Sequence, residues 1–363
     1  MPSTSKKRLR LSFAAVSSAV VFLLAISSPH KNWDMIPYVA AAYEQQGFSG
    51  EYLLDMTFQD VERFVTPVEF LVLTRGRYRD AIYQDAEALQ QQLPFYKPRF
   101  IYVTLINAVG QLLESMSFAT VLISAFFGAL VVFIAGLMVL GLSSPVAFYS
   151  VPPAVAIMGA TSLARFSTPD ALAACSAAAA FFFIYKHRTL PAMVLIAFLP
   201  LIRTDFIVLS LALSAYLFVQ GTRVTALAFA LSLLGYYFTN QYAGNYGHLV
   251  IFNFTLIYGP QAYPADMPVS QDVWDYVRAY YGGSRRFLES NTFFFAVPVL
   301  VFLASHWDCS KGLGAIRWLF LISLFFMGAH FALFPAAFSR TYFLFVWSGI
   351  ILLAHMYELQ RST

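Results

Sequence analysis

Apolar runs separated by short polar breaks dominate the chain. The first run covers Leu11 to Ile26, and others recur as far as the C-terminus at lengths typical of membrane-crossing helices. Some are shorter than the roughly 20 residues that a perpendicular span needs, so the apolar pattern fixes the ends of these spans only to within a few residues. The pattern predicts an all-α polytopic membrane protein with about ten transmembrane helices, folded as one domain over residues 1–363. After the first, the predicted spans are 118–140, 144–161, 169–185, 189–202, 204–220, 224–240, 293–306, 317–334 and 341–357.

The basic residues before the first run allow two interpretations. Lys6-Lys7-Arg8-Leu9-Arg10 and the apolar run together have the layout of a secretory signal peptide, with Ala25-Ile26-Ser27 as a possible cleavage site. We favour an uncleaved first helix, because the run is long for a signal peptide and many further spans follow it.

Basic residues in the short loops predict the orientation. Lys and Arg in such loops gather on the cytoplasmic side, and a cytoplasmic N-terminus satisfies this rule at four separate segments. The rule also requires that Phe100 to Leu113 does not cross, so we predict a helix lying at the outer interface there. The predicted location is a bacterial inner membrane with both termini in the cytoplasm. The basic residues that fall inside are Lys186 with Arg188, Arg223, Lys311 with Arg317, and Arg361.

Two long polar segments, 28–117 and 241–292, then lie on the periplasmic face. The first has candidate helices at Asp34 to Gln46, Phe58 to Leu73 and Tyr83 to Gln92, with breaks at Pro94 and Pro98. The second is rich in turn-forming residues and aromatics. Its aromatic side chains could stack on sugars, although anchoring at the level of lipid headgroups is the commoner use. These side chains are Trp274, Tyr276, Tyr280 and Tyr281.

Composition supports the membrane assignment and excludes several other classes. The chain of 363 residues is 59% hydrophobic and 12% charged, with a mean hydropathy of +0.65, which is too apolar for one soluble core. The net charge of +4 is small and its basic residues form no stripe, so nucleic acid is not an expected partner. Cys175 and Cys309 are too few for a disulfide framework or a metal site. Phosphate-loop, nucleophile-elbow and zinc-protease motifs are also missing from the sequence.

Three charged residues of the predicted outer face are candidates for chemistry. Asp34 lies just beyond the first span, at the depth of lipid headgroups, where a carboxylate could take a proton from an incoming hydroxyl group; alternatively it caps the next helix. Lys97 could grip a phosphate, or it could anchor the interfacial helix by snorkelling. Arg340 stands at the outer end of the last span, where the topology gives no reason for a cation, and its guanidinium could hold a phosphate bidentately.

Charged residues in the short outer connections have simpler explanations. Arg203 and Asp205 are close enough in sequence to pair with each other, which is the interpretation that we favour. Asp170 begins a predicted helix, where the helix dipole favours an acid. His330 is the only histidine in the outer half of a predicted span, and a lone intramembrane histidine is usually a packing residue.

In their order along the chain, these parts resemble the GT-C superfamily of integral membrane glycosyltransferases, which includes the protein O-mannosyltransferases and the aminoarabinose transferases that act on lipid A. The resemblance covers most of the chain, although Met35 stands where the family usually has a second acid and Pro98 replaces a pair of prolines. The segments that carry it are Asn32-Trp33-Asp34 with Pro37-Tyr38, Tyr96-Lys97-Pro98-Arg99-Phe100-Ile101-Tyr102, Arg165 to Leu172, Leu201-Ile202-Arg203-Thr204-Asp205, and Ser339-Arg340-Thr341-Tyr342.

The resemblance implies inverting transfer of a sugar from a polyprenyl-phosphate-linked donor to a lipid, glycan or protein acceptor. We expect no cofactor, and the sequence indicates no metal site. The resemblance also implies Asp34 as general base and Lys97 and Arg340 near the donor phosphate. The main alternative is a transporter or lipid flippase, which predicts charges near the bilayer midplane. A second alternative is a non-catalytic scaffold, which would have no need to gather an acid and cations around one cavity. The remaining residues that the resemblance assigns to the site are Asp170, Arg203, Tyr38 and Tyr342.

Overall fold

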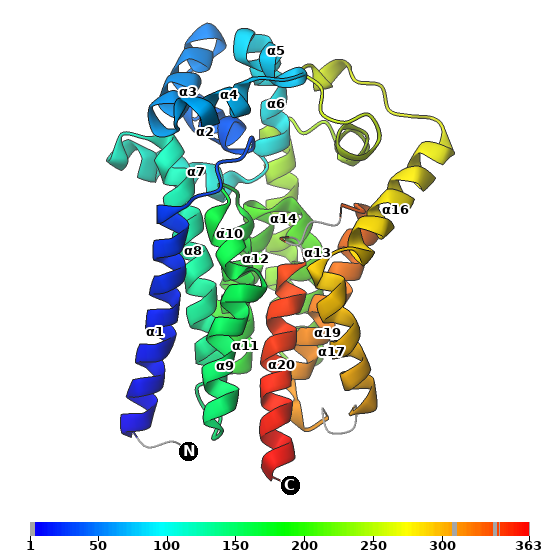
Figure 1. Cartoon of the computed structure of the whole chain (residues 1–363). Coiled ribbons are helices and arrows are strands. Elements are labelled where there is room, and N and C mark those ends of the chain that lie inside the picture. The colour runs from blue at the N-terminus through cyan, green and yellow to red at the C-terminus, as the bar shows by residue number, and fades with distance from the viewer. Residues whose placement is uncertain (1–3, 307–310, 337–339, 341, 363) are drawn as a thin grey trace.

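The chain forms a bundle of roughly parallel helices covered at one end by a layer of shorter ones (Figure 1). The computed structural model describes residues 4–306, 311–336, 340 and 342–362. Helix α1 (Thr4–Ser27) begins, and helix α20 (Phe343–Ser362) ends, at what we call the terminal end. The covering layer lies at the opposite end, which we call the loop end. The described residues form helices and no strand, so the all-α prediction is confirmed.

Several helices are long and apolar enough to cross a membrane. In the described part of the chain five satisfy this test by length and composition, and a sixth does if α16 and α17, which meet at a bend of 71°, count as one span. The structure therefore supports a multi-pass membrane protein. The five are α1, α8 (Met116–Val139), the continuous run α9–η1–α10 (Pro145–Arg165), α19 (Ala315–Leu333) and α20.

The other predicted spans are also helical, but they are shorter or less apolar than this test requires. They lie close to their predicted positions because the apolar runs that form them end at polar or turn residues. These helices are α11 (Asp170–Tyr185), α12 (Thr189–Ile202), α13 (Ile207–Val219), α14 (Thr225–Ala243) and α17 (Asn291–Ser305).

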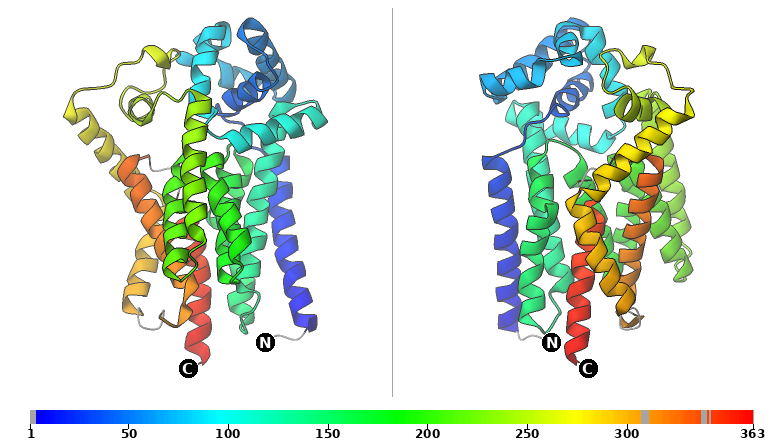
Figure 2. Two further views of the ribbon diagram at one scale, coloured as in Figure 1. Left: turned by 180° about the vertical axis from the view of Figure 1, so that it is seen from behind. Right: turned by 45° about the vertical axis from the view of Figure 1, so that its right-hand side comes forward.

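Helix α1 packs along α8 at the flank of the bundle (Figure 2). Gly136 of α8 faces Ala14 so closely that a side chain on the glycine would collide with it. The Ser18 hydroxyl donates a hydrogen bond to the Ala129 carbonyl at 2.7 Å. Arg10 is buried and donates to backbone carbonyl groups just beyond the end of α8. The first helix is thus packed against the bundle along α8.

The covering layer consists mainly of α2 (Met35–Glu44), α3 (Gly50–Phe64), α4 (Pro67–Thr74), α5 (Tyr78–Gln84), α6 (Ala86–Tyr96) and α7 (Phe100–Leu113). Figure 2 shows α7 lying across the loop end of the bundle.

Two helices predicted in this layer are each divided in the structure. The predicted helix from Phe58 to Leu73 is broken because Thr66 accepts a hydrogen bond from the Glu69 amide and caps a new helix, α4. Asp85 caps α6 in the same way and separates it from α5. Pro94 is not a break, since it lies in the last turns of α6. Local capping chemistry accordingly outweighed the continuity of the apolar pattern.

The second polar segment is more ordered than its composition indicates. It contains α15 (His248–Phe252), the π-helix η3 (Asn253–Ile257), the short 3-10 helix η4 (Pro264–Asp266) and a long helix, α16 (Val273–Leu288), which the sequence analysis missed. The Gln92 side-chain amide of α6 donates to the carbonyl oxygens of Gln261 at 3.0 Å and Ala262 at 2.9 Å. The two predicted outer segments are therefore joined in one layer.

Candidate functional site

Charged residues from distant parts of the chain meet at the loop end. Asp34 precedes α2, Asp170 begins α11, Arg203 follows α12 and Arg340 precedes α20. The contact between Asp34 and Arg340 joins positions 306 residues apart. Each side chain stands at the end of a helix, so the packing of the bundle gathers them. We call Asp34, Asp170, Arg203, Asp205, His330 and Arg340 the charge cluster.

Asp34 is held by three side chains. Its Oδ2 atom lies 3.4 Å from Nη1 of Arg340 and accepts a hydrogen bond from the Asn32 amide at 2.9 Å. Its Oδ1 atom accepts one from the Tyr96 hydroxyl at 3.1 Å. The carboxylate makes no capping hydrogen bond to α2, so the capping alternative does not describe it. The side chains of Asp34 and Arg340 are 27% and 25% exposed, which leaves this ion pair accessible.

Asp170 is the buried centre of the charge cluster. Its side chain is only 4% exposed and lies between two guanidinium groups. Its Oδ2 atom is 3.6 Å from Nε of Arg340 and accepts a hydrogen bond from the Thr168 hydroxyl at 2.6 Å, while its Oδ1 atom contacts Nη1 of Arg203. A carboxylate buried to this extent needs such partners. The helix dipole alone therefore does not account for this residue.

Arg203 pairs with Asp205 as the sequence analysis favours. The guanidinium grips the carboxylate bidentately, with Nε 3.0 Å from Oδ1 and Nη2 2.8 Å from Oδ2. Two further contacts of this pair were not predicted: Arg203 also contacts Asp170, and Nε2 of His330 lies 3.2 Å from Oδ2 of Asp205. The other ring nitrogen of His330 is buried and has no hydrogen-bond partner among the described residues. The only feature of the sequence that pointed to His330 as a site residue was that no other histidine lies in the outer half of a predicted span.

A buried tyrosine, Tyr38, and a partly buried one, Tyr96, adjoin the carboxylate of Asp34. The Tyr38 ring meets the edges of Tyr96 and Tyr102, each with ring centroids 5.0 Å apart. Burial raises the pKa of Tyr38 to about 12, Asp34 adds to the rise, and nearby guanidinium groups, Arg99 foremost, oppose it. Burial first and then Asp34 also raise the pKa of Tyr96 well above its usual value. Both hydroxyls thus remain protonated at neutral pH, and that of Tyr96 donates a hydrogen bond to Asp34.

Lys97 has partners outside the charge cluster. Its Nζ atom lies 3.0 Å from Oε2 of Glu44 and 5.7 Å from the centre of the Tyr242 ring. These contacts tie the end of α6 to α2 and α14. No described contact links Lys97 to Asp34 or Arg340.

Tyr342 is buried beside the charge cluster and packs against aromatic residues. Its ring lies edge-on to Phe287, with centroids 5.6 Å apart, and 6.2 Å from the ring of His330. It thus supports the wall around His330. Ser339 and Thr341 of the same motif, and Cys309, lie outside the described residues.

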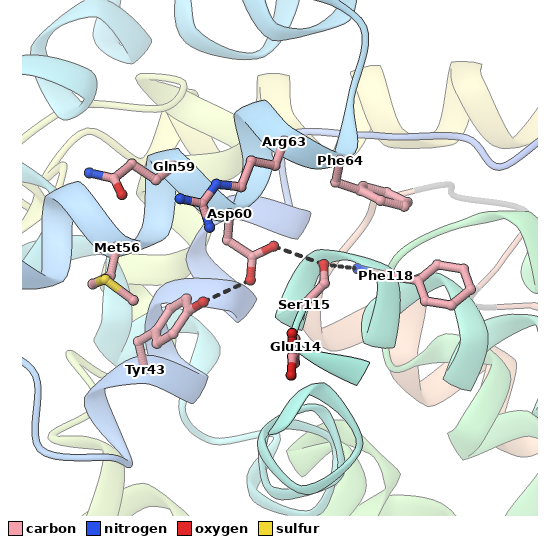
Figure 3. Close-up of a pocket in the computed structure, with 9 residues that line it drawn as sticks. All are labelled: Tyr43, Met56, Gln59, Asp60, Arg63, Phe64, Glu114, Ser115 and Phe118. Atoms are coloured by element: carbon pink, nitrogen blue, oxygen red, sulfur yellow. Dashed lines mark hydrogen bonds between the residues drawn. The ribbon is translucent and has the colours of Figure 1, made fainter. Parts of the chain in front are cut away.

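A second buried acid at the loop end has a different environment, which we call the Asp60 clamp (Figure 3). Asp60 of α3 accepts hydrogen bonds from the Tyr43 hydroxyl at 2.8 Å and from the Ser115 hydroxyl at 3.0 Å. It also accepts from the backbone amides of Met116 at 2.7 Å and Ser117 at 3.2 Å. Asp60 therefore caps α8 and fixes the covering layer onto it. The hollow beside it, of about 260 Å³, includes none of the predicted site residues.

The charge cluster combines two guanidinium groups with three carboxylates, of which Asp34 belongs to an accessible ion pair. Arginine is well suited to phosphate because its guanidinium matches two phosphate oxygens. Arg340 is accessible and is shared between Asp34 and Asp170, so an incoming anion can exchange with one of these carboxylates. No group of three or more His, Cys, Asp or Glu in the described part of the chain is arranged to hold a metal ion. Comparison with protein-family models, curated proteins and solved structures gave no match.

Proposed function

We propose that this protein is a membrane glycosyltransferase of the GT-C type, which moves a sugar with inversion from a polyprenyl-phosphate-linked donor to a lipid, glycan or protein acceptor. The observation that carries the proposal is the meeting of Asp34 with Arg340, with Asp170 and Arg203 beside them. A transporter would be expected to hold its charges near the middle of the bundle, whereas these side chains lie at helix ends of the loop end.

In the proposed reaction Asp34 is the general base. Its carboxylate takes the proton of the acceptor hydroxyl, the acceptor oxygen bonds to the anomeric carbon, and the bond from that carbon to the phosphate oxygen breaks. The leaving group is polyprenyl phosphate, whose charge Arg340 and Arg203 offset. Tyr96 donates to Asp34 and holds its orientation. Tyr38 supplies a further donor toward the bound ligand.

The ion pair between Asp34 and Arg340 links binding of the sugar donor to the state of Asp34. Arg340 lies against Asp34 before the donor arrives. When a phosphate takes over this guanidinium, the carboxylate of Asp34 is released from its ion pair and is left to face the acceptor hydroxyl. We therefore assign the donor phosphate to Arg340 and Arg203 in place of Lys97, whose ion pair with Glu44 has a structural role.

The proposal includes the membrane topology. About ten helices cross, the shorter ones within the bundle, with the termini in the cytoplasm and the loop end in the periplasm of a bacterial inner membrane. The common end at which α1 begins and α20 ends supports an even number of crossings.

The test compares wild type, Asp34→Asn and Arg340→Gln for polyprenyl-phosphate binding and for sugar transfer from a lipid-linked donor. Asp34→Asn should bind at least as tightly as wild type, because it removes a carboxylate that competes for Arg340, and should lose about 10²–10⁴ in rate. Arg340→Gln should bind more weakly. Arg63→Gln is the matched control, since Arg63 is an exposed arginine of the loop end that lines the hollow beside Asp60. Undiminished transfer by Asp34→Asn would remove Asp34 from the mechanism.

A further inference from the structure

Helix α16 runs obliquely at the edge of the bundle, between the covering layer and α17 (Figures 1 and 2). Its sixteen residues include apolar, charged and small side chains in a pattern that repeats with the helical period. The result is three distinct faces along one helix: a packed face, a charged face and an exposed apolar face.

The packed face fixes α16 to the rest of the protein. The Tyr280 hydroxyl donates to the carbonyl oxygen of Ala332, in the last turn of α19, at 2.5 Å. Gly283 lies so close to Pro335 that a Cβ atom there would collide with its backbone. Phe287 packs against Tyr342. Helix α16 is therefore held in place against the chain that leads to Arg340.

The exposed face is apolar and aromatic. Its side chains recur at helical spacing and are exposed, Tyr281 by 73% and Trp274 by 62%. Five large apolar side chains on one uncovered face of a helix need an apolar environment. This apolar stripe consists of Val273, Trp274, Val277, Tyr281 and Leu288.

The charged face borders the stripe. Arg278 pairs with Asp275 at 3.1 Å, and Arg285 pairs with Glu289 at 3.0 Å. Exposed pairs of this kind contribute little to stability, so their guanidinium groups are free to face water or headgroups. An apolar stripe with tryptophan and tyrosine beside an arginine-containing edge is typical of a helix that lies in a membrane interface.

Helix α17 indicates what covers the stripe. It follows α16 after the 71° bend, contains no charged residue, and also exposes apolar side chains, among them Phe294, Val297 and Val301. The apolar surface thus continues from α17, which passes the test for a membrane span only together with α16, onto a helix inclined to it by 71°. The 15 residues of α17 are about 22 Å long, less than the roughly 30 Å of a hydrocarbon core, so a bilayer that surrounds α17 extends past the bend onto α16.

We propose that the apolar stripe of α16 is a lipid-binding surface that lies in the headgroup and upper acyl region of the outer leaflet. The stripe enters the lipid by about 5–10 Å, and the arginine edge faces the headgroups and water. The inference does not depend on sugar transfer. If the proposed function also holds, this surface brings a lipid-borne substrate to the flank of the protein on which Arg340 stands.

The experiment measures the fluorescence of Trp274 in bilayers of phosphatidylcholine brominated either near the headgroup or near the chain end. Trp274 emission is the difference between wild type and Trp274→Phe. Two controls are obtained in the same way from Trp33→Phe, a residue 9% exposed at the loop end, and Trp318→Phe, a residue 44% exposed on α19. We expect bromine to quench Trp274 and Trp318 but not Trp33. Trp274 should be quenched more by bromine near the headgroup than by bromine near the chain end, and hardly at all by iodide in the water.

Two results would overturn the proposal. Quenching of Trp274 by iodide but not by bromine would place the stripe in water, available to a soluble partner. Stronger quenching from the chain ends would mean that α16 crosses the membrane with α17 as one bent span. A second variant, Val277→Ser with Tyr281→Ser, should reduce the bromine quenching of Trp274 while leaving that of Trp318 unchanged. Equal quenching in this variant and in wild type would also contradict the assignment.

Discussion

The charge cluster and the Asp60 clamp both hold buried acids at the loop end, but with different partners. Asp60 accepts hydrogen bonds from two hydroxyls and two backbone amides, all of them neutral and fixed by α2 and α8. Asp170 lies between two guanidinium groups, one of which also reaches Asp34. An acid that accepts hydrogen bonds from backbone amides at the start of a helix has donors that cannot move away from it, so it has a structural role. Guanidinium groups shared among carboxylates can instead exchange partners with an anionic ligand.

Removal of Asp170 should give the largest loss of stability. Asp170→Ala creates a buried cavity and removes one of the two carboxylates that Arg203 contacts. Breaking a buried ion pair in this way typically lowers the free energy of unfolding by about 3–5 kcal/mol. Thermal unfolding in detergent, followed by circular dichroism, measures the effect. Asp170→Asn, which keeps the shape and one hydrogen bond, should lose less. Equal stability of Asp170→Ala and wild type would show that this ion pair is not formed.

Removal of Asp60 should have a smaller effect. Asp60→Ala strands the Tyr43 hydroxyl and the amides that begin α8, with an expected loss of about 1–3 kcal/mol. Asp55→Ala, on the exposed side of the same helix, is the matched control and should stay within about 0.5 kcal/mol of wild type. If both variants unfold at the same temperature, the clamp does not hold the covering layer.

Substitution of Tyr38 should alter the rate modestly. Tyr38→Phe removes one neutral donor, and we expect transfer to fall about two- to tenfold. Because the pKa of Tyr38 is raised to about 12, its hydroxyl is protonated throughout the neutral range. The variant and wild type should therefore have parallel pH–rate profiles between about pH 6 and 9. A limb of the profile that disappears in Tyr38→Phe would contradict this protonation state.

Lys97 should be the least sensitive of the predicted site residues. Lys97→Gln breaks a partly exposed ion pair with Glu44, worth about 0–1 kcal/mol. Donor binding should remain close to that of wild type, in contrast to Arg340→Gln. A loss of binding equal to that of Arg340→Gln would return Lys97 to the phosphate site.

Local patterns in the sequence predicted the positions of most helices but not the contacts between them. The apolar runs ended where α8, α11 and α12 end, because helix ends carry local polar and turn signals. The division at Thr66 was also readable, since its capping box with Glu69 is a local motif. Helix α16 was missed because its apolar residues form only one of three faces and are interrupted by glycines and arginines.

The candidate site was only partly predictable for the same reason. The position of Arg340 before the last span was recognisable as unusual for a cation, whereas the spacing of Arg203 indicated only a pair with Asp205. Which carboxylates they meet depends on the packing of the bundle, and so does the partner of Lys97. His330 joined the charge cluster through its contact with Asp205, which no spacing in the sequence indicates.

The most direct test of the central claim assigns a separate role to each of two acids. Asp34→Asn and Asp60→Asn are compared for sugar transfer per folded molecule and for unfolding temperature. The account predicts that Asp34→Asn unfolds like wild type but transfers about 10²–10⁴ more slowly, whereas Asp60→Asn unfolds earlier and transfers at nearly the wild-type rate. Equal transfer by wild type and Asp34→Asn, or an equal loss in both variants, would contradict it.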